Sequence, residues 1–150
     1  MQWAILGGLA SGSIPMSPGS QNRKVLIVED DAAIRNVLYV LLAGFGCEGD
    51  IAYSGKQALA MLSRERFDAV LLDLRCSNLP AADMVSQIKE IRPSLVGRVL
   101  VITGELTDAQ TMEMVAQNCL PHVPRNRLMQ DLWGRLRTVL GISGTPRPAA

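Results

Sequence analysis

Phe67-Asp-Ala-Val-Leu-Leu-Asp-Leu74 is the stretch of this chain that decides its fold. The run is almost continuously apolar, which is typical of a strand that is covered on both faces and lies centrally in a parallel sheet. A second apolar run, Val25-Leu-Ile-Val28, leads into Glu29-Asp30-Asp31, and the first run carries its own carboxylate, Asp73, near its end. Because the carboxyl ends of parallel strands meet at one edge of a sheet, these acidic residues are expected to lie together.

Short apolar runs alternate with segments of helical period from Lys24 onward, and five such pairs can be counted. This pattern predicts an α/β fold, a doubly wound parallel sheet with helices on both faces. The expected strands are 25–28, 47–53, 67–74, 98–103 and a short one around 122–123, with 47–53 nearer an edge. The expected helices follow them. Four have apolar faces at 34–42, 58–62, 84–91 and 129–140, and the helix after the fourth strand is expected at about 107–117.

The composition limits the class of protein. With 150 residues, of which 48% are hydrophobic, the chain has material for one well-buried domain. A net charge of +1 shows no basic excess, so direct nucleic-acid binding is not predicted. The three cysteines, Cys47, Cys76 and Cys119, are odd in number and have no CxxC spacing. They argue against a disulfide framework and a zinc site, and favour a reducing, cytoplasmic setting.

The two ends of the chain are expected to lie outside the folded domain, which we place at residues 23–142. Residues 1–10 are apolar but too short to span a bilayer and lack a charged first region, so neither a signal peptide nor a membrane anchor is predicted. Residues 1–22 are interpreted as a flexible leader, or as an over-extended start with Met16 as the true initiator. Residues 143–150 are interpreted as a flexible tail.

Reactive side chains follow successive predicted strands. Glu29 and Asp30 follow the first, Asp73 ends the third, Thr103 ends the fourth and Arg125 lies just beyond the fifth. Clustered carboxylates repel unless a cation joins them, and a divalent metal with oxygen ligands is the simplest such cation. A carboxylate nucleophile, acidic metal ligands, a hydroxyl and a cation are the groups needed to accept a phosphoryl group. Asp73 would then become an acyl phosphate.

Three motifs carry a family resemblance: Val25-Leu-Ile-Val-Glu-Asp-Asp-Ala-Ala-Ile-Arg35, Asp68-Ala-Val-Leu-Leu-Asp-Leu74 and Val99-Leu-Val-Ile-Thr-Gly104. In order and at this spacing they resemble the receiver domain of two-component response regulators, over about residues 23–142. The resemblance implies a flavodoxin-like (βα)5 sandwich with strand order 2-1-3-4-5. It also implies a signalling domain that catalyses only its own phosphoryl transfer and dephosphorylation, with no other enzymatic activity.

The resemblance assigns roles to particular residues. Asp73 is the implied phosphoacceptor, Thr103 the switch hydroxyl, and His122 stands where the family often has a switch aromatic residue. Mg²⁺ is the implied cofactor, and its implied ligands are Glu29, Asp30, Asp73 and the backbone carbonyl of Arg75. The implied partners are a histidine kinase or phosphotransfer protein as donor and a downstream protein, and the last helix-strand-helix face is an implied surface for a homodimer. A weak likeness of residues 92–104 to receivers attached to histidine kinases leaves open a place in a larger protein.

Two departures from the family pattern leave alternatives open. Arg125 and Asn126 stand where the family has Lys-Pro, and Cys76-Ser77 and Pro80-Ala81 replace the usual residues after the acceptor. A degenerate receiver that binds a partner without being phosphorylated is therefore the main alternative. An Asp-nucleophile phosphatase is disfavoured, because that class is expected to have a second Asp where Arg75 stands.

Simpler interpretations also exist for single residues. Glu29 and Asp30 could merely suit a helix N-terminus. Arg127 competes with Arg125 for the cationic role.

Overall fold

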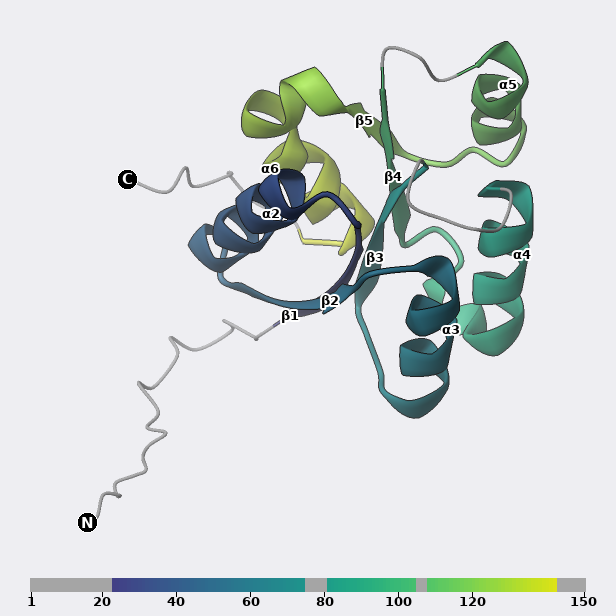
Figure 1. Ribbon diagram of the computed structural model, residues 1–150, viewed down its shortest axis with the longest axis horizontal. Helices are drawn as coiled ribbons and strands as arrows, with labels where there is room; N and C mark the ends of the chain where they lie inside the picture. The colour runs from purple at the N-terminus through teal and green to yellow at the C-terminus, as the bar shows by residue number, and fades with distance from the viewer. Residues whose placement is uncertain (1–22, 75–80, 105–107, 143–150) are drawn as a thin grey trace.

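In residues 23–74, 81–104 and 108–142, which the computed structural model describes, five parallel strands form one sheet. Their order is β2-β1-β3-β4-β5, and the predicted α/β fold with order 2-1-3-4-5 is confirmed (Figure 1). The strands are β1 (Arg23–Val28), β2 (Cys47–Ala52), β3 (Ala69–Asp73), β4 (Val99–Thr103) and β5 (His122–Pro124).

The position of each strand follows from its residues. Every residue of β3 and β4 is buried, as expected for strands covered on both faces. In β2, by contrast, Glu48 is exposed and Asp50 half-buried, which suits the edge position predicted for this strand and protects an open edge from pairing with another chain. The predicted strand 67–74 begins only at Ala69, because the backbone N–H of Lys24 bonds to the side chain of Asp68.

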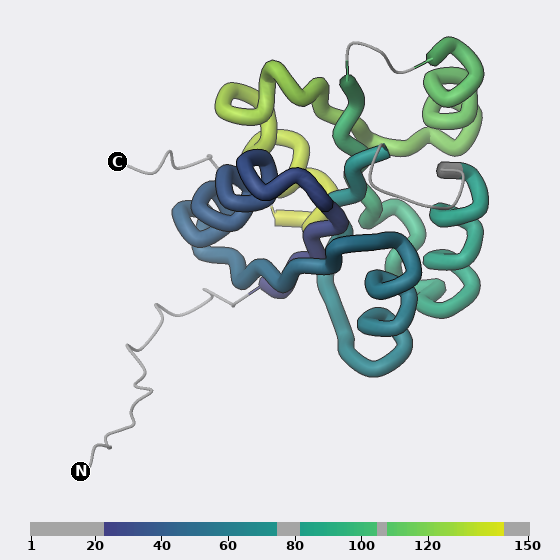
Figure 2. Tube along the Cα trace, viewed as in Figure 1, coloured from purple at the N-terminus to yellow at the C-terminus, as the bar shows by residue number. Residues whose placement is uncertain are grey.

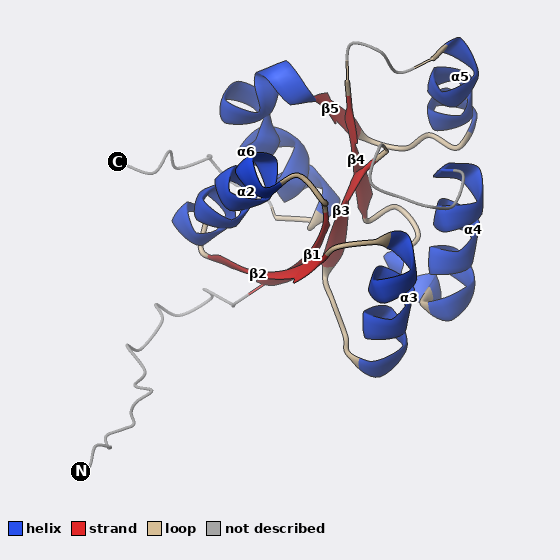
Figure 3. Ribbon diagram, viewed as in Figure 1, coloured by secondary structure: helices blue, strands red, loops and turns tan. Residues whose placement is uncertain are grey.

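Helices cover both faces of the sheet (Figure 3). In the described part of the chain they are α2 (Ala32–Gly44), α3 (Gly55–Arg64), α4 (Ala81–Ile91), α5 (Ala109–Gln117) and α6 (Leu128–Val139), with short 3-10 turns η1 (Pro93–Leu95) and η2 (Arg125–Arg127). Helices α2 and α6 pack on one face through a cluster that includes Leu38, Leu42, Leu132 and Leu136. Helices α3, α4 and α5 pack on the other through a cluster that includes Ala58, Leu62, Met84, Ile88 and Val115.

Side-chain caps begin three of these helices. Asp31 begins α2, Ser54 begins α3, and Asp108 begins α5 by accepting a hydrogen bond from the amide of Thr111 at 2.7 Å. Since the cap is Asp108, the helix predicted for 107–117 starts at Ala109, and residue 107 lies outside the described residues. Asp and Ser caps satisfy backbone N–H groups that have no partner within the helix.

The first strand and the last helix close the domain against each other. Arg23, at the start of β1, donates a hydrogen bond to the backbone carbonyl of Leu140, just after α6, at 3.1 Å. Figure 2 follows the chain from one of these points to the other. A guanidinium at a helix C-terminus also complements the partial negative charge there.

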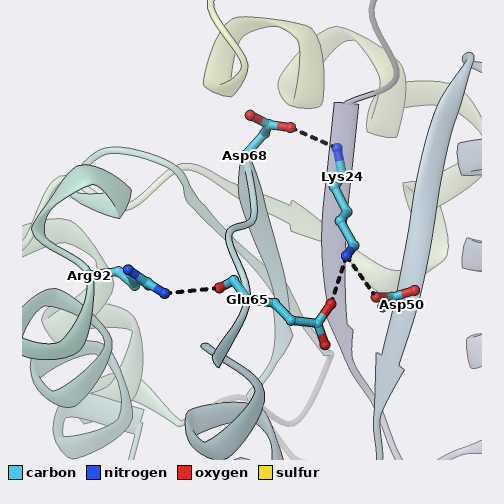
Figure 4. A network of polar contacts seen from close by, with 5 residues as sticks. All are labelled: Lys24, Asp50, Glu65, Asp68 and Arg92. Carbon is cyan, nitrogen blue, oxygen red and sulfur yellow. Dashed lines mark hydrogen bonds and ion pairs between the residues drawn. The ribbon is translucent and has the colours of Figure 1, made fainter. Parts of the chain in front are cut away.

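A network of polar contacts lies near the amino ends of the strands, away from the carboxyl ends where Glu29 and Asp73 lie (Figure 4). The ammonium of Lys24 lies 2.7 Å from the carboxylate of Glu65 and 3.6 Å from that of Asp50. The carboxylate of Asp68 accepts the backbone N–H of Lys24 at 2.7 Å. Arg92, after α4, donates to the backbone carbonyls of Leu62 and Glu65. These contacts join β1, β2, α3 and α4 to one another.

Asp68→Ala is expected to lower the free energy of unfolding by about 1–2 kcal/mol, because the half-buried N–H of Lys24 loses a charged acceptor. Asp68→Asn keeps an acceptor oxygen and should cost clearly less. Urea unfolding of both variants measures the difference. Equal losses in the two variants would show that the hydrogen bond is not what the carboxylate contributes.

Candidate functional site

The carboxyl ends of the central strands bring the predicted site residues to one edge. In the register of the sheet Asp73 is paired with Ile102, and Thr103 with Pro124, the residue before Arg125. Glu29 follows Val28, which is paired with Leu72 next to Asp73. The four side chains therefore follow β1, β3, β4 and β5 at neighbouring positions, as the sequence predicted.

Burial singles out the same residues. Among the described residues, the polar or charged ones that are buried are Glu29, Asp73 and Thr103, with exposed fractions of 0%, 1% and 5%. A buried carboxylate is costly unless it is paired, hydrogen-bonded or bound to a metal. Two of them side by side are an arrangement that a folded protein keeps for a chemical reason more often than for stability.

Arg125 is the cation that lies on the phosphoacceptor candidate. Its Nη2 forms an ion pair with Oδ2 of Asp73, and its side chain is 20% exposed. Arg127, the alternative named above, is turned away and pairs with Asp131 at 2.7 Å within the next helix. The second terminal nitrogen of Arg125, Nη1, is buried and has no acceptor in the described part of the chain.

Glu29 is held by one oxygen only. Its Oε1 accepts the backbone N–H of Asp31 at 3.2 Å, while its buried Oε2 accepts no hydrogen bond from the residues that the structure describes. Burial, and then the neighbouring Asp73 carboxyl, raise the pKa of Glu29 to about 8; the Asp31 amide and the charge of Arg125 act in the opposite direction. Arg125 therefore favours the carboxylate form of Glu29, but its charge does not outweigh burial and the Asp73 carboxyl.

These two carboxyls suit a hard divalent cation. Such ions take carboxylate and carbonyl oxygens as ligands, and a cation at Glu29 would compensate both its burial and its repulsion from Asp73. Asp30, the third predicted ligand, is exposed at the rim, and the carbonyl of Arg75 lies outside the described residues. Within the described ranges no group of three or more His, Cys, Asp or Glu side chains is gathered closely enough to hold a metal ion.

The other predicted residues lie farther along the same edge. His122 is half-buried in β5 and is paired with Val101. Asn126 is exposed in η2, directly after Arg125. The altered acceptor loop, residues 75–80, lies outside the described residues.

Sequence reasoning missed the part that Asp31 plays. Its backbone amide holds Oε1 of Glu29, while its side chain accepts the N–H groups of Ala33 and Ile34 and so begins α2. An Asp directly before a helical pattern is a recognisable N-cap, so the signal was present in the sequence.

Comparison with known proteins agrees with the geometry. The family model described as response regulator receiver domain matches residues 25–132. This chain belongs to that family. The receiver domain is similar to part of the transcriptional regulatory protein ZraR of Escherichia coli, with 29% identity over 119 residues, which are 79% of this chain and 26% of that protein. It is also similar to the response regulator MprA of Mycobacterium avium, with 26% identity over 78% of this chain and 50% of that protein.

Solved structures share the fold. The receiver domain of a sensor histidine kinase from Pseudomonas aeruginosa, described with a magnesium ion in its active site cleft, matches with a TM-score of 0.65 and 21% identity, over 81% of this chain and 99% of that one. A CheY-like receiver domain protein from Methanospirillum hungatei matches with a TM-score of 0.66 and 19% identity, over 82% and 100%. The receiver domain spans at most half the length of the curated relatives named above.

One further property follows from the helices. None of those that the structure describes combines the length and the apolar character that crossing a membrane requires.

Proposed function

We propose that this receiver domain accepts a phosphoryl group on Asp73 from a phosphohistidine of a histidine kinase or phosphotransfer protein. The observation that carries the proposal is the buried Asp73 carboxylate at the end of the central strand, flanked by the buried Glu29. The proposed ligands of Mg²⁺ are Glu29, Asp30, Asp73 and the backbone carbonyl of Arg75. The proposed setting is the cytoplasm, with 23–142 as the domain.

The reaction forms a bond between a carboxylate oxygen of Asp73 and phosphorus. The bond from phosphorus to the donor's imidazole nitrogen breaks, and the imidazole keeps the electron pair. Mg²⁺, when bound, neutralises the negative charge that gathers on the carboxylates and the phosphoryl oxygens. Thr103, at the end of β4, supplies a hydroxyl that donates to one phosphoryl oxygen, and Arg125 supplies a cation for another.

Phosphorylation of Asp73 would alter the protein surface through structural changes at the ends of β4 and β5. Thr103 would move toward the phosphoryl group, and His122 and the α5-β5-α6 face would repack, so a local electrostatic event biases a two-state element. A downstream protein, or a second copy of the chain, would bind this face. No enzymatic activity beyond phosphoryl transfer and hydrolysis at Asp73 is proposed.

A second candidate function is a receiver that is not phosphorylated and acts as an interaction module. The observation that favours it is the ion pair between Arg125 and Asp73, because a guanidinium on the acceptor oxygen competes with a metal and a phosphoryl donor. The two candidates make opposite predictions for the reactivity of Asp73.

Incubation with acetyl phosphate and Mg²⁺, followed by intact mass spectrometry, is the test. A labile adduct of one phosphoryl group that forms with Mg²⁺ and fails to form with EDTA is the expected result. An unmodified mass under both conditions would favour the interaction module. Steady release of phosphate from unrelated esters would instead indicate a phosphatase.

A further inference from the structure

Arg125 holds a position that no other cation of the described chain shares. The residue follows β5 directly, one position after the residue that is paired with Thr103. The sheet therefore places the backbone of Arg125 at the edge where Asp73 ends β3, and its guanidinium reaches the acceptor carboxylate from there.

The guanidinium of Arg125 is a planar fork with two terminal nitrogens, and only one of them has a partner among the described residues. Nη2 is paired with Oδ2 of Asp73, while the buried Nη1 donates to no described residue. A buried donor without an acceptor is unfavourable, so an acceptor that enters beside Asp73 gains from pairing with it. A phosphoryl group on Asp73 presents three oxygens, and a guanidinium is the side chain whose planar geometry matches two of them at once.

We infer that Arg125 binds the phosphoryl group through both terminal nitrogens, so that recognition depends on the guanidinium fork and not on positive charge alone. The inference rests on the proposed function and deepens it. Lysine supplies one compact ammonium instead of a planar fork. Replacing Arg125 by lysine would therefore keep the positive charge but lose the geometry that matches two oxygens. In the unmodified protein the same fork is the partner of Asp73, which it must exchange for the phosphoryl oxygens.

Beryllofluoride, a phosphoryl mimic that binds an aspartate carboxylate, is the probe, titrated at saturating Mg²⁺ with the amide signals of Asp73 and Thr103 followed by NMR. Arg125→Lys is expected to bind it about tenfold more weakly than the unsubstituted protein, the effect of losing one charge-assisted hydrogen bond. Arg125→Gln, which keeps an amide donor without charge, should bind at least as weakly as Arg125→Lys. Arg127→Lys is the matched control, since Arg127 pairs with Asp131, and should leave the affinity unchanged.

The outcomes distinguish a failure of the inference from a failure of the proposed function. If the unsubstituted protein responds and Arg125→Lys binds equally tightly, charge alone suffices and the inference is overturned while the proposed function stands. If the unsubstituted protein gives no response, the proposed function fails and the inference with it. Thermal melts of all variants show whether each is folded, and two different substitutions at Arg125 guard against the loss of one.

Discussion

Asp73→Asn is expected to abolish the phosphoryl adduct that acetyl phosphate forms with the unsubstituted protein. The amide is no nucleophile at neutral pH, and Asp73 is a buried carboxylate at the end of the central strand, beside Glu29. The same change removes one of the two buried carboxyls that face the proposed cation. Affinity for Mg²⁺ should therefore fall by at least about tenfold, measured by titration of the amide signals near Glu29.

The matched control is Asp31→Asn. Asn caps a helix about as well as Asp, so the hydrogen bonds to Ala33 and Ile34 and the backbone N–H that holds Glu29 should survive. This variant removes a neighbouring negative charge without touching the proposed acceptor, and it should still form the adduct. An adduct that persists in Asp73→Asn would place the phosphoryl group on another residue and overturn the assignment of Asp73.

The fold was predictable because local patterns carried most of it. The apolar run before Asp73 predicted a central strand covered on both faces, and β3 is such a strand. The weaker run after Cys47 predicted an edge, and β2 lies there. Boundaries were less well predicted, because Asp68 bonds through its side chain to the backbone of Lys24, a contact across 44 positions that no local pattern contains.

The site was predictable in position and less so in its contacts. Strand ends and residue types brought Glu29, Asp73 and Thr103 to one edge, and burial agrees with that choice. The sequence named Arg125 as the cation and left Arg127 as a competitor, because the two arginines are two residues apart and their partners depend on the turn η2. In the structure Arg125 pairs with Asp73, 52 positions away in the sequence, and Arg127 pairs with Asp131, one helical turn away. Long-range electrostatic pairing of this kind needs the folded sheet.

The stability of the metal-free protein is expected to depend on pH through Glu29. Its pKa is raised to about 8 in the folded protein, against an ordinary value of 4.5, so between these values the folded state binds more protons than the unfolded chain. The contribution of Glu29 is therefore fully present below about pH 4.5 and is lost as the pH rises toward about 8. Glu29→Gln removes this loss, because a neutral amide does not titrate.

In EDTA at about pH 8, Glu29→Gln should accordingly be more stable than the unsubstituted protein, by on the order of 4 kcal/mol, since the pKa is raised from 4.5 to about 8 and one pKa unit corresponds to about 1.4 kcal/mol. The difference should vanish near pH 4.5. Saturating Mg²⁺ should reverse the stability difference at the higher pH, because the cation binds and stabilises the Glu29 carboxylate, whereas the neutral amide in Glu29→Gln offers it no negative charge. Urea unfolding across this range measures all three effects, with the exposed Glu113→Gln as control. If the free energies of unfolding of the two proteins in EDTA change with pH in parallel, the pKa of Glu29 is not raised by folding. The case for a cation beside Asp73 must then rest on other residues.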